Sequence, residues 1–261
     1  MMAQHKPLFL VITGDGINCE RETAAAFMHA GGDARIMHVN DLLAAPEKLA
    51  AYDGMAIPGG FSFGDELGSG QILALKIRHG LGDAFARFIA RKKPVIGICN
   101  GFQVLVKLGL LPFPDAPARL CALAPNAHGG FMDRWATLLP QQSHCIWTAG
   151  IDKPLRLPVR HGEGRIVFAE GRAEELHAQL AQNGQIPFCY DADINGSYAN
   201  IAALCDPTGY VLGLMPHPEA FMHAETAPQA QKQQPGDGFI LFDNVIRHLQ
   251  GQEKIREQRI A

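Results

Sequence analysis

The sequence predicts an α/β fold built on a doubly wound, mostly parallel β-sheet with helices on both faces. Short apolar segments rich in β-branched residues alternate with segments of helical character through the first half of the chain. Glycine and proline follow several of these apolar segments, which is typical of buried strands that run into loops. The second half is richer in strand patterns and predicts an antiparallel extension of the sheet.

The first half supplies the alternating elements. Leu8–Thr13 is apolar and ends at a Gly-Asp-Gly loop, so it predicts a buried strand. Residues 20–30 have helical character and stop at two consecutive glycines. Further strands are expected at residues 34–39, 54–57 and 94–98, and further helices at residues 82–91 and 100–108.

The second half predicts mainly strands and a closing helix. One domain is expected over residues 8–250. Residues 223–237 are polar and contain two prolines, so they predict a surface loop, and residues 251–261 predict a frayed, charged tail. Phe239–Leu249 predicts an amphipathic helix. The strands are expected at residues 136–139, 155–159, 165–168, 186–190, 201–204 and 211–215.

Composition excludes several classes of function. The 261 residues carry 26 acidic and 23 basic side chains, and no long basic run could neutralise a nucleic-acid backbone. No apolar run approaches the roughly 20 residues that a membrane-spanning helix needs. We therefore expect no nucleic-acid partner, no membrane and a cytoplasmic location. The six cysteines contain no CxxC pair, which favours reduced thiols.

One of these cysteines has the surroundings of a nucleophile. Cys99 lies between Gly97 and Gly101 at a predicted junction from strand to helix, as in a G-x-S-x-G elbow with sulfur in place of oxygen. The glycines are needed because the turn is tight and the nucleophile adopts a strained backbone conformation. The start of the following helix favours negative charge on the sulfur. The other five cysteines are expected to act as small, buried, apolar side chains. They are Cys19, Cys121, Cys145, Cys189 and Cys205.

Acyl transfer by a thiolate also needs a proton shuttle and donors for an oxyanion. His217 and Glu219, two residues apart on a segment that we expect to be extended, project to the same side, so the carboxylate can orient the imidazole. Taken alone, the pair also fits a plain surface turn. Gly59 and Gly60 follow an apolar strand, and their amides and that of Asn100 are candidate oxyanion donors.

Several motifs resemble those of class I glutamine amidotransferases. They are PGGF at residues 58–61, GICNGFQ at residues 97–103 and MPHPE at residues 215–219. The chain resembles the glutaminase subunits of phosphoribosylformylglycinamidine synthase still more closely. This closer resemblance is carried by GGFSFGDELGSGQILA from residue 59, CNGFQVLVKLGLLP from residue 99, RHGEGRIVF from residue 160 and a long block over residues 194–219.

The resemblance implies a flavodoxin-like class I amidotransferase fold and a Cys-His-Glu triad. Cys99 would attack the side-chain amide of L-glutamine, His217 would protonate the departing ammonia, and Glu219 would orient His217. Gln103 and the backbone of Gly59 and Gly60 would help to hold substrate and oxyanion. This subunit would need no cofactor or metal.

The same resemblance implies partners. A large synthetase subunit would use ATP and Mg²⁺ to activate formylglycinamide ribonucleotide, and a small accessory subunit would complete the complex. Many subunits of this type continue HPER, whereas this chain has Ala220 after Glu219 and a long following loop. These departures concern the surface that faces the partner.

Three alternatives stay open from the sequence. The chain can serve another synthetase, such as those for GMP, CTP or imidazole glycerol phosphate, although the FSFGD segment argues against this. It can also be a flavodoxin-like redox sensor or chaperone without glutaminase activity. Finally, His161 and Glu163 of the HGEG loop can be structural or can bind the α-carboxylate or α-amino group of glutamine.

Overall fold

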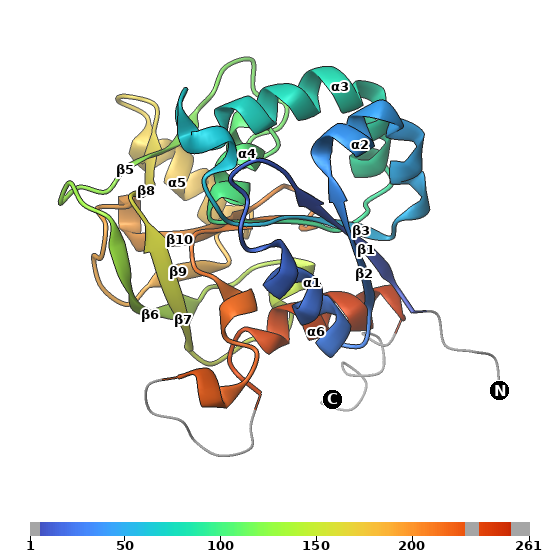
Figure 1. Cartoon of the computed structure of the whole chain (residues 1–261). Coiled ribbons are helices and arrows are strands. Elements are labelled where there is room, and N and C mark those ends of the chain that lie inside the picture. Colours follow the sequence, from blue (N-terminus) through green and yellow to red (C-terminus); the bar gives the residue numbers. More distant parts are fainter. Residues whose placement is uncertain (1–5, 228–234, 252–261) are drawn as a thin grey trace.

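The structure of the protein, a computed structural model, describes residues 6–227 and 235–251. Nine strands form one sheet in the order β2-β1-β3-β4-β11-β10-β9-β6-β7. Helices α2, α3 and α4 lie on one side of this sheet, and α1 and α6 lie on the other (Figure 1). The predicted fold class is confirmed. The sheet strands are β1 Leu8–Thr13, β2 Asp33–His38, β3 Gly54–Ile57, β4 Val95–Ile98, β6 Met132–Pro140, β7 Leu155–His161, β9 Phe188–Tyr190, β10 Ile201–Cys205 and β11 Val211–Leu214.

The sheet has a parallel and an antiparallel half. Strands β2, β1, β3, β4 and β11 pair in parallel, whereas β10, β9, β6 and β7 continue the sheet through antiparallel pairs. Since the carboxyl ends of parallel strands share one edge, loops after β1, β3, β4 and β11 meet there. The helices are α1 Glu20–His29, α2 Val39–Ala44, α3 Gln71–Ala90, α4 Asn100–Leu108, α5 Ala173–Gln182 and α6 Phe239–Leu249.

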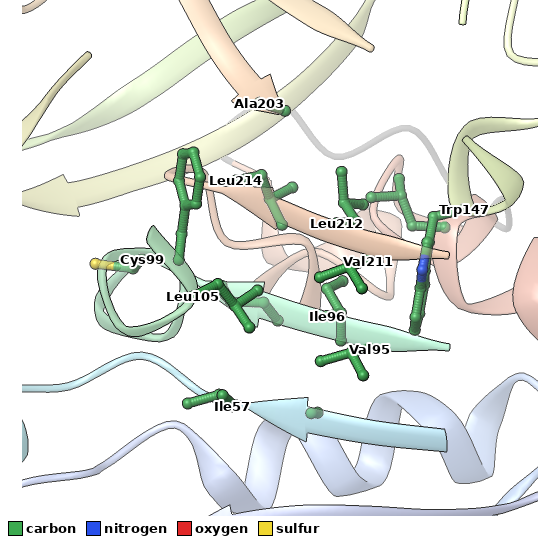
Figure 2. Close-up of a cluster of buried hydrophobic side chains, with 14 of the residues drawn as sticks. Ile57, Val95, Ile96, Cys99, Leu105, Trp147, Ala203, Val211, Leu212 and Leu214 are labelled. Carbon is green, nitrogen blue, oxygen red and sulfur yellow. The ribbon is translucent and has the colours of Figure 1, made fainter. Parts of the chain in front are cut away.

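The hydrophobic core runs along the central strands. Every residue of β3, β4 and β11 is buried, because helices cover both faces of the parallel half. Trp147 is fully buried, and its indole N–H donates to the Tyr210 carbonyl at 3.1 Å. Figure 2 shows this apolar cluster, with Cys99 at its margin beyond the end of β4. The core therefore fixes the positions of β3, β4 and β11, and the residues that follow these strands form the candidate site.

One predicted sheet strand belongs elsewhere. Residues 165–168 fall within β8 (Glu163–Phe168), but β8 pairs with β5 (Cys121–Pro125) in a separate two-stranded sheet. Strand β5 was not predicted. Its sequence CALAP alternates poorly and ends in proline, so the period-two signal is weak.

The helical predictions also needed correction. The helix expected at residues 82–91 is the second part of α3, which starts at Gln71 and bends at Gly82, where φ is 33°. Gly80 and Gly82 weakened the helical signal before the bend. Helices α2 and α5 were missed, because α2 has only six residues and α5 carries only two buried apolar side chains, Leu176 and Leu180.

The structure describes only part of the C-terminal region for which predictions were made. Within residues 223–237, Ala224–Thr226 forms a short 3₁₀ turn, and residues 228–234 lie outside the described residues. Helix α6 has the predicted bounds. Gly251 is exposed, and residues 252–261 of the predicted tail are also outside the described part. None of the helices in the described ranges is both long and apolar enough to cross a membrane.

Candidate active site

Cys99 occupies the turn between β4 and α4 in a strained backbone conformation. Its φ is 53° and its ψ is −106°, a backbone conformation that residues other than glycine rarely adopt. The turn is tight because α4 packs directly on β3. A Cβ atom on Gly101 would lie 1.8 Å from the carbonyl oxygen of Ile57, and one on Gly97 would lie 2.5 Å from that of Gly101. The steric explanation for the flanking glycines is thus supported.

His217 and Glu219 follow β11, which lies next to β4 in the sheet. Leu214 pairs with Ile98, so the segments after the two strands leave the same edge together. The segment is not extended as expected, because Pro218–Ala220 forms a 3₁₀ turn. The two side chains nevertheless meet, with His217 Nδ1 2.6 Å from Glu219 Oε1, and they are only 2% and 4% exposed.

The surroundings of His217 favour its protonated form. Burial alone would lower the pKa of His217, but the Glu219 carboxylate and, to a smaller extent, the sulfur atoms of Cys19 and Cys99 hold this pKa well above its usual value. His217 Nε2 has no hydrogen-bond partner among the described residues. The Cys99 thiol instead donates to the Arg160 carbonyl, with 3.6 Å between sulfur and oxygen. The sulfur of Cys99 thus lies close enough to the imidazole to raise its pKa, while its thiol proton is directed at Arg160.

Gly59 separates the cysteine from the histidine. A Cβ atom at Gly59 would lie 2.7 Å from His217 Cε1 and 3.5 Å from Cys99 Cβ. The Gly59 carbonyl accepts from the amides of Asn18 and Cys19, each at 3.3 Å. Because the C=O and N–H of a trans peptide point in opposite directions, the Gly60 N–H points away from these amides.

Asn100 and Gln103 hold neighbouring segments in place. The Asn100 side chain accepts from the Ser62 hydroxyl at 2.6 Å and donates to Asp65 and Gln103, each at 3.0 Å. Gln103 Nε2 donates to the Glu163 carbonyl at 2.7 Å. Both polar atoms of the Gln103 amide are therefore already engaged. The network ties α4 to the segment after β3 and to the HGEG loop.

His161 is buried beside the same site as a neutral base. Asn126 Nδ2 donates to the carbonyls of Gly130 and His161, so Asn126 Oδ1 must accept from His161 Nδ1 at 3.1 Å. His161 Nε2 is consequently an acceptor, and it has no partner in the described part of the chain. Burial, with smaller effects of His217 and His128, lowers the pKa of His161 to about 4.

A cavity of about 350 Å³ unites these residues. Its polar and reactive lining includes Cys19, Cys99, Gln103, His161 and His217. Gly60 also lines the cavity, whereas Gly59 and Asn100 are not among its lining residues. The volume suits a small polar metabolite of the size of an amino acid.

The sequence of residues 6–249 matches the CobB/CobQ-like glutamine amidotransferase domain. This match covers nearly the whole chain. The protein belongs to this glutamine amidotransferase family. The family resemblance seen in the sequence motifs is thereby confirmed.

Individual relatives of this amidotransferase align with it over most of both chains. It is 41% identical over 239 residues to a phosphoribosylformylglycinamidine synthase subunit PurQ of Methanococcus maripaludis, with 86% of each chain covered. The subunit of the same name from Dehalococcoides mccartyi is 38% identical over 245 residues, which cover 91% of this chain and 96% of the relative. A chain in the structure of PurLQS from Thermotoga maritima superposes with a TM-score of 0.76 and 29% identity, covering 94% and 100% of the two chains.

Sequence reasoning missed several residues that line the cavity of this amidotransferase, among them Cys19 and Arg160. Cys19 was expected to be an ordinary buried cysteine. It is buried, but it lies at the start of α1 with its sulfur within 4.8 Å of a His217 ring nitrogen. Arg160 supplies the carbonyl that accepts from Cys99. The position of Cys19, just after the loop that follows the first parallel strand, is a signal that could have placed it at the sheet's carboxyl edge.

Proposed function

We propose that this chain is the glutaminase subunit of phosphoribosylformylglycinamidine synthase. It hydrolyses L-glutamine to glutamate and ammonia through Cys99, His217 and Glu219. One observation carries this proposal: a strained cysteine at a helix start and a buried histidine line the same cavity, and a buried glutamate hydrogen-bonds to that histidine.

In this mechanism the Cys99 thiol passes its proton to His217, and the resulting thiolate attacks the side-chain amide carbon of glutamine. The C–N bond then breaks, and the imidazolium of His217 gives this proton to the departing ammonia. A water molecule hydrolyses the resulting thioester, with neutral His217 accepting the proton that the water loses. Glu219 keeps the imidazole oriented and stabilises its positive charge. The elevated pKa of His217 supports its role as the proton donor.

The remaining site residues have supporting roles in this proposal. The Gly60 and Asn100 amides stabilise the oxyanion, and Gly59 provides the space in which sulfur and imidazole face each other. His161 accepts from a substrate N–H, such as that of the α-ammonium group, because its Nε2 is unprotonated and unpartnered. Gln103 positions the HGEG loop.

The ammonia passes to a partner. We propose a large synthetase subunit that uses ATP and Mg²⁺ to convert formylglycinamide ribonucleotide to formylglycinamidine ribonucleotide in purine biosynthesis in the cytoplasm, together with a small accessory subunit. The names of the relatives, and the PurLQS assembly in which a similar chain occurs, support this partner. The glutaminase subunit itself uses no cofactor.

A reconstituted complex tests the proposal. The chain is mixed with its synthetase and accessory subunits, ATP, Mg²⁺ and formylglycinamide ribonucleotide, and product is measured with glutamine or with ammonium salt. We expect both nitrogen sources to work with the wild type and only ammonium to work with Cys99→Ala. Glutamine-dependent product from Cys99→Ala would contradict the mechanism. Stimulation of glutamine hydrolysis only by the acceptor of another synthetase would contradict the assigned partner.

A further inference from the structure

Cys19 is a second thiol at the catalytic histidine, and the proposed mechanism does not use it. Its sulfur would lie 3.4 Å from a Cβ atom built on Gly59, the same point that lies 2.7 Å from His217 Cε1. The side chain is buried but lines the cavity, and its thiol donates to Asn18 Oδ1 at 3.2 Å. Cys19 therefore reaches the imidazole from within the site.

Three different ligand types come together at this point. The Cys19 sulfur, one ring nitrogen of His217 and one carboxylate oxygen of Glu219 all lie within 4.8 Å of one another, and all three residues are buried. The ring nitrogen beside the carboxylate is His217 Nδ1, 2.6 Å from Glu219 Oε1. The other carboxylate oxygen, Glu219 Oε2, is buried and has no hydrogen-bond partner in residues 6–227 and 235–251, so it has unused bonding capacity.

This donor set suits one class of cation. Zn²⁺ binds thiolate at about 2.3 Å and imidazole nitrogen or carboxylate oxygen at about 2.0–2.2 Å, in tetrahedral geometry. Ligand atoms around such an ion are separated by roughly 3–4 Å, so side-chain shifts of about 1 Å would close the cluster. Mg²⁺ and Ca²⁺ prefer oxygen ligands and would not select a sulfur and a nitrogen.

We propose that Cys19, His217 and Glu219 form an inhibitory site for Zn²⁺, with the fourth coordination position open to the cavity. The ion replaces the Cys19 proton and the proton between His217 Nδ1 and Glu219 Oε1, so that both the imidazole and its orienting carboxylate become ligands. His217 can then no longer deliver a proton to departing ammonia. The inhibition rests on the proposed function, but binding of the ion does not, and glutamine hydrolysis itself does not use the ion.

Two measurements on the full chain test this site. Cd²⁺, which takes the same ligands as Zn²⁺, is titrated while the thiolate-to-cadmium absorption band is recorded in the ultraviolet. Separately, the zinc concentration that halves glutamine hydrolysis is measured in zinc-buffered solutions, relative to the zinc-free rate of each variant. The variants are Cys19→Ala, the near-isosteric Cys19→Ser, Cys99→Ala and, as a matched control away from the site, the half-buried Cys189→Ala.

We expect the wild type and Cys189→Ala to bind one Cd²⁺ with equal affinity. Loss of a direct ligand should cost at least as much as loss of an outer-shell partner, so both Cys19 variants should bind Cd²⁺ at least about tenfold more weakly and need correspondingly more Zn²⁺ for inhibition. Cys99→Ala should keep the cadmium band although it cannot hydrolyse glutamine.

The cadmium readout separates this proposal from the proposed function, because it needs no catalysis. A cadmium band that survives in both Cys19 variants would overturn the site, as would a wild type that shows no band at equimolar Cd²⁺. A band that is lost only in Cys99→Ala would assign the ion to the nucleophile. Circular dichroism of each variant checks that the fold is retained, and the wild-type titration decides the case if both Cys19 variants misfold.

Discussion

The Nδ1 atom of His217 lies 2.6 Å from Oε1 of Glu219, and both side chains are almost completely buried. A buried carboxylate at this distance fixes the imidazole ring and favours its charged form. The opposite nitrogen, Nε2, is left without a partner in the described residues. The pair is therefore built to present one ring nitrogen to a reacting group.

Removing the proton shuttle should damage catalysis more than removing its support. We expect His217→Asn to lower the rate of glutamine hydrolysis by about 10²–10⁴-fold, because general acid–base transfer is worth that much. Glu219→Gln keeps the imidazole and should have a smaller effect. Steady-state kinetics with glutamine measure both. Small and equal effects would show that the pair is only a structural turn.

Gly59 should be intolerant of even one methyl group. In Gly59→Ala the new Cβ atom would lie 2.7 Å from His217 Cε1 and would push the imidazole away from Cys99. A displacement of about 1 Å can cost roughly 10²-fold in rate, so we expect a loss of that order with the fold retained. Gly130→Ala is the control, since its Cβ atom would approach nothing closer than 3.9 Å. Comparable activity of the two variants would argue against this geometry.

His161 should make stability depend on acidic pH. Its pKa falls from 6.5 to about 4 in the folded protein, so the unfolded chain takes up the proton first. The stability that it contributes is complete above pH 6.5 and is lost as the pH falls toward 4. The difference amounts to roughly 3 kcal/mol.

Denaturant unfolding between pH 7 and pH 4 measures this contribution. The free energy of unfolding should fall less steeply with acidification in His161→Gln than in the wild type. The exposed His79, which does not act on the pKa of His161, provides a matched control, and His79→Gln should follow the wild type closely. Parallel pH profiles for His161→Gln and the wild type would contradict a neutral, buried His161.

The isolated chain should hydrolyse glutamine slowly. The Cys99 thiol donates to the Arg160 carbonyl, and this hydrogen bond must break before the sulfur attacks glutamine. Glycines with positive φ at positions 60, 64, 68 and 70 give the segment after β3 the freedom to rearrange when the synthetase binds. Gain of one oxyanion donor is worth about 10²–10³ in rate. Equal kcat values for the free chain and the nucleotide-loaded complex would exclude such activation.

The sequence predicted the parallel half of the fold and the main catalytic candidates because local signals coincide there. Around Cys99, an apolar strand, two glycines and a helical pattern all indicate one turn, and the packing of Gly101 on Ile57 explains why no other residue fits. The order of the motifs also places the segments after β3, β4 and β11 at one sheet edge.

Other features depend on contacts that no local pattern encodes. The pairing of β8 with β5 instead of the main sheet joins segments about forty residues apart. The contact of Cys19 with His217 joins the start of α1 to the turn after β11, and a lone cysteine carries no signal for it. The 3₁₀ turn at Pro218–Ala220 was also missed, because two residues at spacing two fit a strand equally well.

The central claim is that Cys99 is the nucleophile, and covalent trapping tests it most directly. The protein, alone and in its complex, is treated with an electrophilic glutamine analogue that alkylates thiols, and the modified peptide is identified by mass spectrometry. We predict one adduct per chain, on Cys99, whose formation glutamine suppresses and which Cys99→Ala abolishes. An adduct on Cys19 or on any other cysteine, or labelling that glutamine does not suppress, would contradict the account.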